Sequence, residues 1–217
     1  MMQSTRRSLS QSIPKWRICA LFVAPLVLVS AAPPASLPLQ VIDQAGMPVG
    51  DAVIEIARPV GDARAIAFRW RSAMAQKDLA FAPGTLIVGR GASVAFPNLD
   101  TVRHSIYSFS KPGPFKIDLY GRDQTRAQRF DVAGTVALGC NIHDQMRGYI
   151  RIVSTPYAAK SDTNGLAEID GLPQGSYDIT VWHPRLKGAG SEWRGRIVAT
   201  PGKRTRIVVP VRGAGLR

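Results

Sequence analysis

Apolar and polar residues alternate in many short runs along this chain. The alternation is clear at residues 115–120 and 177–182, and β-branched apolar runs stand at 85–88 and 206–211. A period of two residues is typical of half-buried β-strands. Turn sequences rich in Gly and Pro separate the runs, and no segment after residue 31 has a strong helical period. The pattern therefore predicts an all-β protein.

The expected strands fall into three blocks, at residues 39–56, 74–153 and 157–211. The middle block has short strands and turns at the spacing of a β-sandwich with Greek-key connections. The last block opens with Asp162-Thr163-Asn164-Gly165, which is a strong hairpin turn. At about 60 residues, this block is small for a hydrophobic core of its own. Between the first two blocks, residues 59–71 are irregular and basic, as expected for a loop.

The first residues have the features of an export signal. Basic residues, among them Arg6 and Arg7, precede an apolar run at 18–32, and small residues at 29–31 provide a cleavage site. The run is shorter than the roughly 20 residues of a membrane span. We therefore expect a signal peptide at residues 1–31, periplasmic localisation and no integral membrane span after cleavage. A retained anchor is the alternative, and the sequence leaves the Sec and twin-arginine export routes open.

Export changes the meaning of the two cysteines. Cys19 lies inside the expected signal, so the mature chain holds a single thiol, Cys140. An intramolecular disulfide is then impossible, although the compartment is oxidising. A lone cysteine in an exported protein is a liability, an intermolecular bridge or a ligand. The neighbours of Cys140 favour a ligand.

Four residues form a candidate metal site. Cys140, His143 and Met146 stand three residues apart, and His104 lies upstream at the start of an expected strand. One thiolate, two imidazoles and a weak axial thioether are the ligands of a mononuclear blue (type 1) copper site. We expect His104 before one strand and the other three ligands in the loop between the last two strands of the middle block.

Other interpretations of these residues are weaker. Zinc also accepts one Cys and two His, but a thioether suits copper better. The third histidine of the mature chain, His183, has no Cys or carboxylate cluster beside it in the sequence, and we expect it to be structural or on the surface. Gly139, just before the thiol, leaves room for close approach of backbone or ligand. Ser105 and Asn98 are candidates for hydrogen bonds across the site.

Residues 72–154 resemble a cupredoxin. The short loop with Cys140, His143 and Met146 is similar to that of amicyanin, although Asp144 and Gln145 stand where amicyanin has Pro and Phe. The wider pattern is more similar still to periplasmic plastocyanin-like proteins of the methylamine utilisation type. The segments that carry this resemblance are 96–98, 104–110, 139–146 and 181–184. By resemblance, the copper ligands are His104, Cys140, His143 and Met146.

The remaining blocks resemble a small Ig/transthyretin-like β-sandwich, the carboxypeptidase regulatory-like module. Such modules begin with a strand, a turn and a Pro-Val segment, and residues 43–53 fit that opening. We expect residues 37–58 and 156–212 to form one discontinuous module, with the cupredoxin domain inserted between them. That arrangement would also explain the small size of the last block.

The net charge and the expected export of the chain limit the classes of function and partner that fit it. The net charge of +13 falls to about +9 after signal removal, and such a chain attracts acidic partners. Nucleic acid does not fit an exported protein whose basic residues are scattered. We expect an electron carrier rather than an enzyme, with one type 1 copper and an acidic redox partner such as a cytochrome or a dehydrogenase. The alternatives are a copper-storage protein without electron transfer and a structural β module with a vestigial site.

Overall fold

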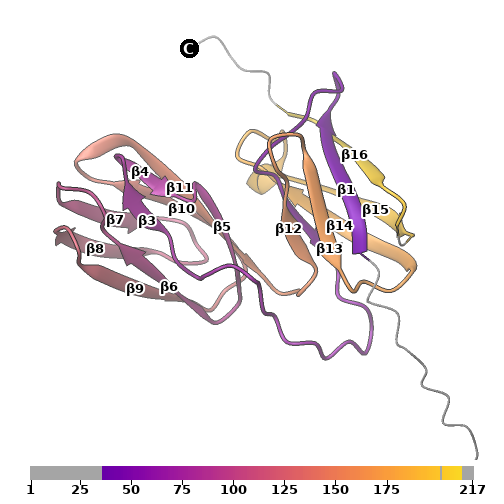
Figure 1. Ribbon diagram of the computed structural model, residues 1–217, viewed down its shortest axis with the longest axis horizontal. Helices are drawn as coiled ribbons and strands as arrows, with labels where there is room; N and C mark the ends of the chain where they lie inside the picture. The colour runs from indigo at the N-terminus through magenta and orange to yellow at the C-terminus, as the bar shows by residue number, and fades with distance from the viewer. Residues whose placement is uncertain (1–35, 201, 212–217) are drawn as a thin grey trace, which may run out of the picture. The chain divides into compact units, whose positions relative to one another are not determined.

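The computed structural model describes residues 36–200 and 202–211, so the predicted signal peptide lies outside the described residues. Within them the chain forms strands and one short 3-10 segment, η1 (Ala189–Ser191). The strands are β1 (Ser36–Asp43), β2 (Val53–Ile56), β3 (Ala75–Lys77), β4 (Ala80–Ala82), β5 (Thr85–Gly89), β6 (Ala92–Pro97), β7 (His104–Ser108), β8 (Phe115–Tyr120), β9 (Thr125–Phe130), β10 (Gly134–Cys140), β11 (His143–Val153), β12 (Ala158–Lys160), β13 (Leu166–Asp170), β14 (Gly175–Trp182), β15 (Glu192–Ala199) and β16 (Thr205–Val209). The prediction of an all-β chain built of β-sandwiches is confirmed (Figure 1).

The strands from β3 to β11 surround one hydrophobic core. A five-stranded sheet has the order β5-β11-β10-β7-β8, and β3–β4 and β6–β9 form two small sheets. Side chains such as Phe96, Ile106, Phe130 and Ile150 are buried in the core that these sheets enclose. Inward residues alternate with outward ones along β6 and over residues 146–150 of β11, as expected for a two-layer sandwich. Cys140 and Met146 belong to the same core, so two of the four candidate ligands pack among its apolar side chains.

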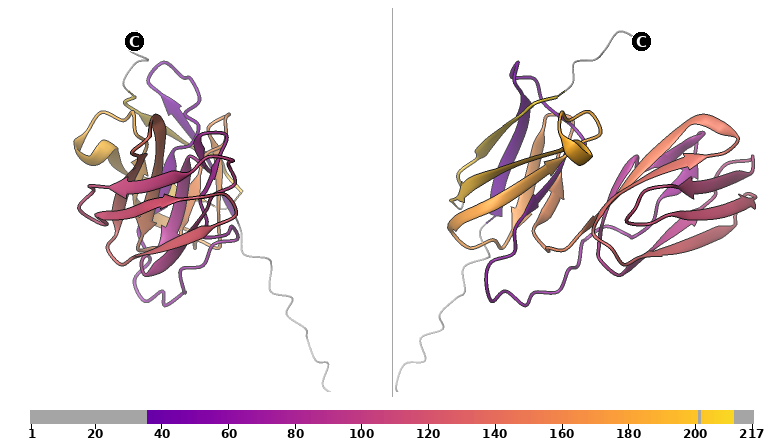
Figure 2. Two further views of the ribbon diagram at one scale, coloured as in Figure 1. Left: turned by 90° about the vertical axis from the view of Figure 1, so that its left-hand side faces the viewer. Right: turned by 180° about the vertical axis from the view of Figure 1, so that it is seen from behind.

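The other strands form two further sheets around a second core. One has the order β13-β1-β16 and the other β12-β2-β14-β15 (Figures 1 and 2). Strand β1 pairs with β13 and β16, and β2 pairs with β12 and β14. Each of the two sheets therefore combines one strand from the start of the described chain with strands from its last part. Buried residues such as Leu39, Ile54, Val181 and Val209 fill the space between them. That this unit is a carboxypeptidase regulatory-like domain, separate from residues 72–154, stays a prediction.

The turn at residues 162–165 differs from its predicted role. The Asp162 carboxylate accepts hydrogen bonds from the backbone N–H groups of Asn164 and Leu166, both at 2.8 Å, so the expected tight turn is present. However, the flanking strands do not form a hairpin, because β12 pairs with β2 while β13 pairs with β1 of the other sheet. The hairpin prediction was wrong, since turn chemistry fixes the local bend but not the partner of each strand.

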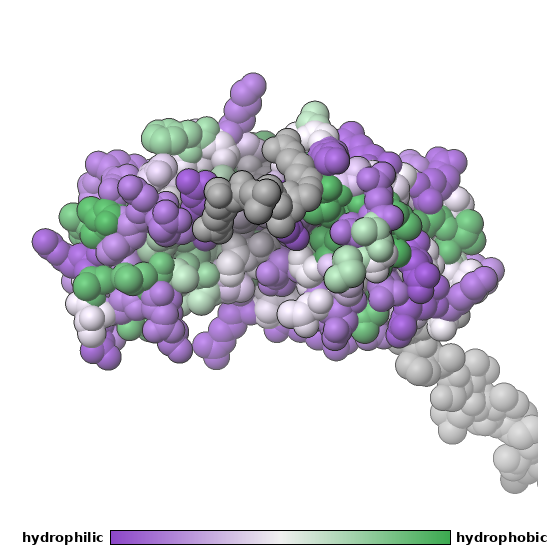
Figure 3. Space-filling view, turned by 90° about the horizontal axis from the view of Figure 1, so that it is seen from above, coloured by the Kyte–Doolittle hydropathy of each residue, from purple (hydrophilic) through white to green (hydrophobic). Residues whose placement is uncertain are grey.

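Twelve large apolar side chains of the described residues are exposed, and Phe109 is among the most exposed at 88%. On the face in Figure 3, apolar residues form small separate groups among hydrophilic ones. The described residues contain no helix that is long and apolar enough to cross a membrane.

Candidate metal centre

The candidate ligands lie on three strands of the five-stranded sheet. His104 is the first residue of β7, Cys140 is the last of β10, and both His143 and Met146 belong to β11. Strands β10 and β11 are therefore joined by a two-residue turn, residues 141–142. The sequence-based placement of His143 and Met146 in a loop was wrong, because both residues belong to β11, although only His143 has a ladder partner on β10.

An irregularity in this ladder explains how β11 supplies two ligands. Gly139 pairs with Arg147, whereas the next residue, Cys140, pairs with His143. Residues 144–146 are thus extra residues on the β11 side, a bulge that redirects the side chains around it. Met146 is turned into the core with 1% of its surface exposed, while Asp144 and Gln145 stay exposed. The bulge places a thioether and an imidazole of one strand at the same end of the sandwich.

The donor atoms of three predicted ligands converge. Cys140 Sγ lies 3.8 Å from His104 Nδ1 and 3.7 Å from His143 Nδ1, and the three donor atoms all lie within 4.8 Å of one another. The two imidazole rings are tilted by 54°, with centroids 4.9 Å apart. His104 and Cys140 are buried and His143 is half-buried. No other group of three potential metal-ligating His, Cys, Asp or Glu side chains occurs within the residues described.

The two sulfur–nitrogen separations have the size expected for donors that share one metal ion. With metal–sulfur and metal–nitrogen bonds of about 2.3 and about 2.0 Å, sulfur and nitrogen lie about 3.5 Å apart at the tetrahedral angle and about 3.7 Å apart at 120°. The 3.8 and 3.7 Å found here are of this size. One Cys, two His and a weak Met donor form the ligand set of blue copper, whereas a thioether is not a usual ligand of structural zinc. The donor set and its spacing therefore fit copper.

His104 is held by a carboxylate that the sequence analysis did not identify. Its Nε2 lies 2.7 Å from Asp100 Oδ2, on the side of the ring away from the thiol. Burial raises the pKa of Asp100, but hydrogen bonds from His104 and from the backbone N–H groups of Leu79 and Asp78 outweigh it, so the pKa lies below its ordinary value. The only sequence signal for this contact is an acidic residue four positions before a histidine.

The residues expected to form hydrogen bonds across the site have separate roles. Ser105 Oγ lies 3.9 Å from Cys140 Sγ and accepts a hydrogen bond from the backbone N–H of Asn141 at 3.2 Å. Asn98 does not reach the ligands. Its side-chain amide donates to the carbonyls of Val102 and Tyr120, and its Oδ1 accepts from the backbone N–H of Asp100. Asn98 thus shapes the loop that leads into His104.

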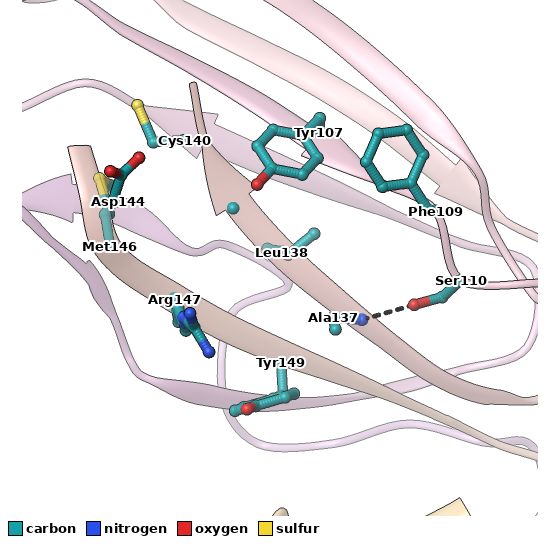
Figure 4. Close-up of a pocket in the computed structure, with 11 residues that line it drawn as sticks. Tyr107, Phe109, Ser110, Ala137, Leu138, Cys140, Asp144, Met146, Arg147 and Tyr149 are labelled. Carbon is teal, nitrogen blue, oxygen red and sulfur yellow. Dashed lines mark hydrogen bonds between the residues drawn. The ribbon is translucent and has the colours of Figure 1, made fainter. Parts of the chain in front are cut away.

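A groove of about 720 Å³ runs beside the thiol and the thioether. Cys140 and Met146 lie at one end of it, and Tyr107 and Phe109 line its other wall (Figure 4). The Tyr107 ring packs on Gly139, where a Cβ atom would lie only 2.6 Å from Cζ of the ring. The group that approaches Gly139 closely is therefore an aromatic side chain, and not the backbone or ligand that the sequence analysis expected.

His183 lies outside this cluster, as the sequence analysis expected. It is buried at the end of β14, and its Nδ1 accepts a hydrogen bond from the backbone N–H of Arg185 at 3.3 Å. Burial and the charge of Arg185 lower the pKa of His183, against an opposing effect of Asp51. These contacts indicate a structural histidine.

The chain was compared with known proteins. No protein-family model matches it, and no curated protein matches it. Among solved structures, it is similar to the oxidised state of an amicyanin mutant, with 20% identity, a TM-score of 0.36, and coverage of 37% of this chain and 80% of that one.

Two further similar structures are a purple cupredoxin from Nitrosopumilus maritimus and a copper-containing nitrite reductase from Thermus scotoductus SA-01. For the purple cupredoxin, identity is 18%, the TM-score is 0.35, and coverage is 38% of this chain and 100% of that one. For the reductase, identity is 23%, the TM-score is 0.38, and coverage is 45% of this chain and 26% of that one. At such low scores the assignment of the metal centre rests on this chain's own residues.

Proposed function

We propose that this protein is a periplasmic electron carrier with one mononuclear type 1 copper site, and that it is not an enzyme. His104, Cys140, His143 and Met146 would hold the ion. One observation carries the proposal: Cys140 Sγ lies 3.8 Å from His104 Nδ1 and 3.7 Å from His143 Nδ1. The side chains of Cys140 and His104 are also buried.

The ligands are supported for rapid electron exchange. When bound, copper supplies a one-electron couple between Cu(I) and Cu(II). Electron transfer is fast when the ligands move little between the two states, and strand ends hold side chains more rigidly than loops do. His104 and Cys140 are strand residues packed in the core, and Ser105 ties the turn after Cys140 to the start of β7. The chain thus keeps the donor atoms together through its own packing.

His143 is the natural point of contact with a redox partner. It is the only one of the three clustered donors in the described chain that is not buried, and Ile142 beside it is 52% exposed. The net charge of about +9 that remains without residues 1–31 favours a partner protein with an acidic surface, such as a cytochrome or a dehydrogenase. Increasing ionic strength would then slow the reaction between the two proteins.

Copper loading of the protein without residues 1–31 tests the proposal. We expect one equivalent of Cu(II) to give an intense blue or green colour, because a thiolate is coordinated, and Cys140→Ser to abolish it. Colourless binding of Cu(I) alone would indicate copper storage instead. Failure to bind copper at all would indicate a structural β module with a vestigial site.

A further inference from the structure

The two nitrogen atoms of the His104 ring have separate partners. Nδ1 faces the thiol of Cys140 at 3.8 Å, and Nε2 lies 2.7 Å from Asp100 Oδ2. The ring has no exposed surface. A carboxylate acceptor at Nε2 requires the ring proton on that nitrogen, which leaves the lone pair of Nδ1 directed toward the metal position.

Asp100 is itself fixed from two sides. Its Oδ1 accepts a hydrogen bond from the backbone N–H of Asp78 at 2.6 Å, and its Oδ2 accepts one from Leu79 at 3.1 Å. Both donors lie in the β3–β4 turn and have a positive φ of 57°. The backbone N–H of Asp100 donates to Asn98 Oδ1 at 2.9 Å. With 11% of its side chain exposed, Asp100 has little freedom to leave His104.

His143 has no corresponding partner. In the part of the chain that the structure describes, it forms no ion pair with any carboxylate, although Asp144 is its neighbour in the sequence. The two imidazoles of the cluster therefore differ in whether a carboxylate contacts the ring nitrogen that faces away from the thiol. Only the buried one has an anion at its outer nitrogen.

We propose that Asp100 is a positioning residue that sets the tautomer of His104 and biases the site toward Cu(II). This inference rests on the proposed copper function. A carboxylate behind a ligating imidazole raises its basicity as a donor, and loss of such a partner typically lowers metal affinity by about 10- to 100-fold. The added negative charge favours the more highly charged ion. Asp100 thus selects between the two oxidation states as well as orienting the ring.

The test compares Asp100→Asn with Asp144→Asn in the protein without residues 1–31. Both variants lose one carboxylate near the site, but only the first loses one that faces an imidazole. We expect Asp100→Asn to lower Cu(II) affinity at least about tenfold and Cu(I) affinity much less. The reduction potential would rise by about 59 mV for each tenfold Cu(II)-selective loss. Asp144→Asn should shift the reduction potential by only a small fraction of the shift in Asp100→Asn.

Equal losses of Cu(I) and Cu(II) affinity in Asp100→Asn, or an equal potential shift in Asp144→Asn, would overturn the inference. Nitrogen-15 NMR of the copper-free protein provides a readout that does not depend on copper. We expect His104 to be protonated at Nε2 in the native protein and to populate the other tautomer in Asp100→Ala. An unchanged tautomer in a folded Asp100→Ala variant contradicts the role of Asp100. A native protein that binds no copper overturns the proposed function instead.

Discussion

Two buried histidines in this chain are stabilised in opposite ways. His104 donates its Nε2–H to a carboxylate, whereas His183 accepts a backbone N–H at Nδ1 and lies near the charge of Arg185. An acceptor nitrogen is lost when the ring becomes protonated, and burial disfavours the charged form. His183 therefore contributes to stability as a neutral ring.

The folded protein should lose stability in mild acid partly through His183. Because burial lowers its pKa in the folded state, its contribution is complete above the unfolded pKa of about 6.5 and decreases as the pH falls through the folded pKa. We expect the free energy of unfolding of the copper-free protein to drop less between about pH 7.5 and pH 5 in His183→Gln than in the native chain. Urea denaturation at both pH values measures this difference, and equal drops would contradict the role of His183.

At the scale of elements, the contact between β7 and β10 fixes the thiol. Gly139 pairs with Tyr107, and the tyrosine ring occupies the space that a side chain at position 139 would need. The register changes immediately afterwards, between Gly139 and Cys140. A small residue at this point lets two strands approach closely where the ladder becomes irregular. The position of Cys140 therefore depends on the residue before it.

Gly139→Ala tests this packing. A Cβ atom would lie 2.6 Å from Tyr107 Cζ, so the ring or a strand must move. We expect the free energy of unfolding of the copper-free protein to fall by about 1–3 kcal/mol, measured by urea denaturation. Gly84→Ala is the matched control, because nothing lies within 4 Å of a Cβ atom there. A Gly139→Ala variant as stable as the control would show that Tyr107 does not constrain this strand.

The sequence predicted the elements better than their local irregularities. Most runs with alternating or β-branched apolar residues are strands, but β3 and β12 have no recognisable pattern because three residues are too short to show a period. The ligands could be recognised because thiol, imidazole and thioether at close spacing are chemically specific. The contact between Asp100 and His104 could not be predicted, since it depends on a loop shaped by Asn98 and the β3–β4 turn.

At the scale of the whole molecule, the strand order separates two cores. The sheets of β3 to β11 enclose one, while the sheets that contain β1 and β2 also recruit strands from β12 onward. An inserted cupredoxin domain at residues 72–154, between residues 37–58 and 156–212, stays a prediction. A domain that has its own core can in principle fold alone.

Separate expression of residues 72–154 tests the insertion. We expect a folded β-protein by circular dichroism that binds one copper ion with the same visible spectrum as the protein without residues 1–31. The Cys140→Ser form of the fragment is the control and should fold without producing the colour. A native fragment that remains unfolded or binds no copper would contradict an independent domain.

The central claim is that Cys140, His104, His143 and Met146 hold one copper ion that exchanges single electrons. Cyclic voltammetry of the copper-loaded protein without residues 1–31 tests it most directly. We predict one reversible one-electron wave, which disappears in Cys140→Ser. Either an irreversible response in the native protein or the same wave in Cys140→Ser would contradict the claim.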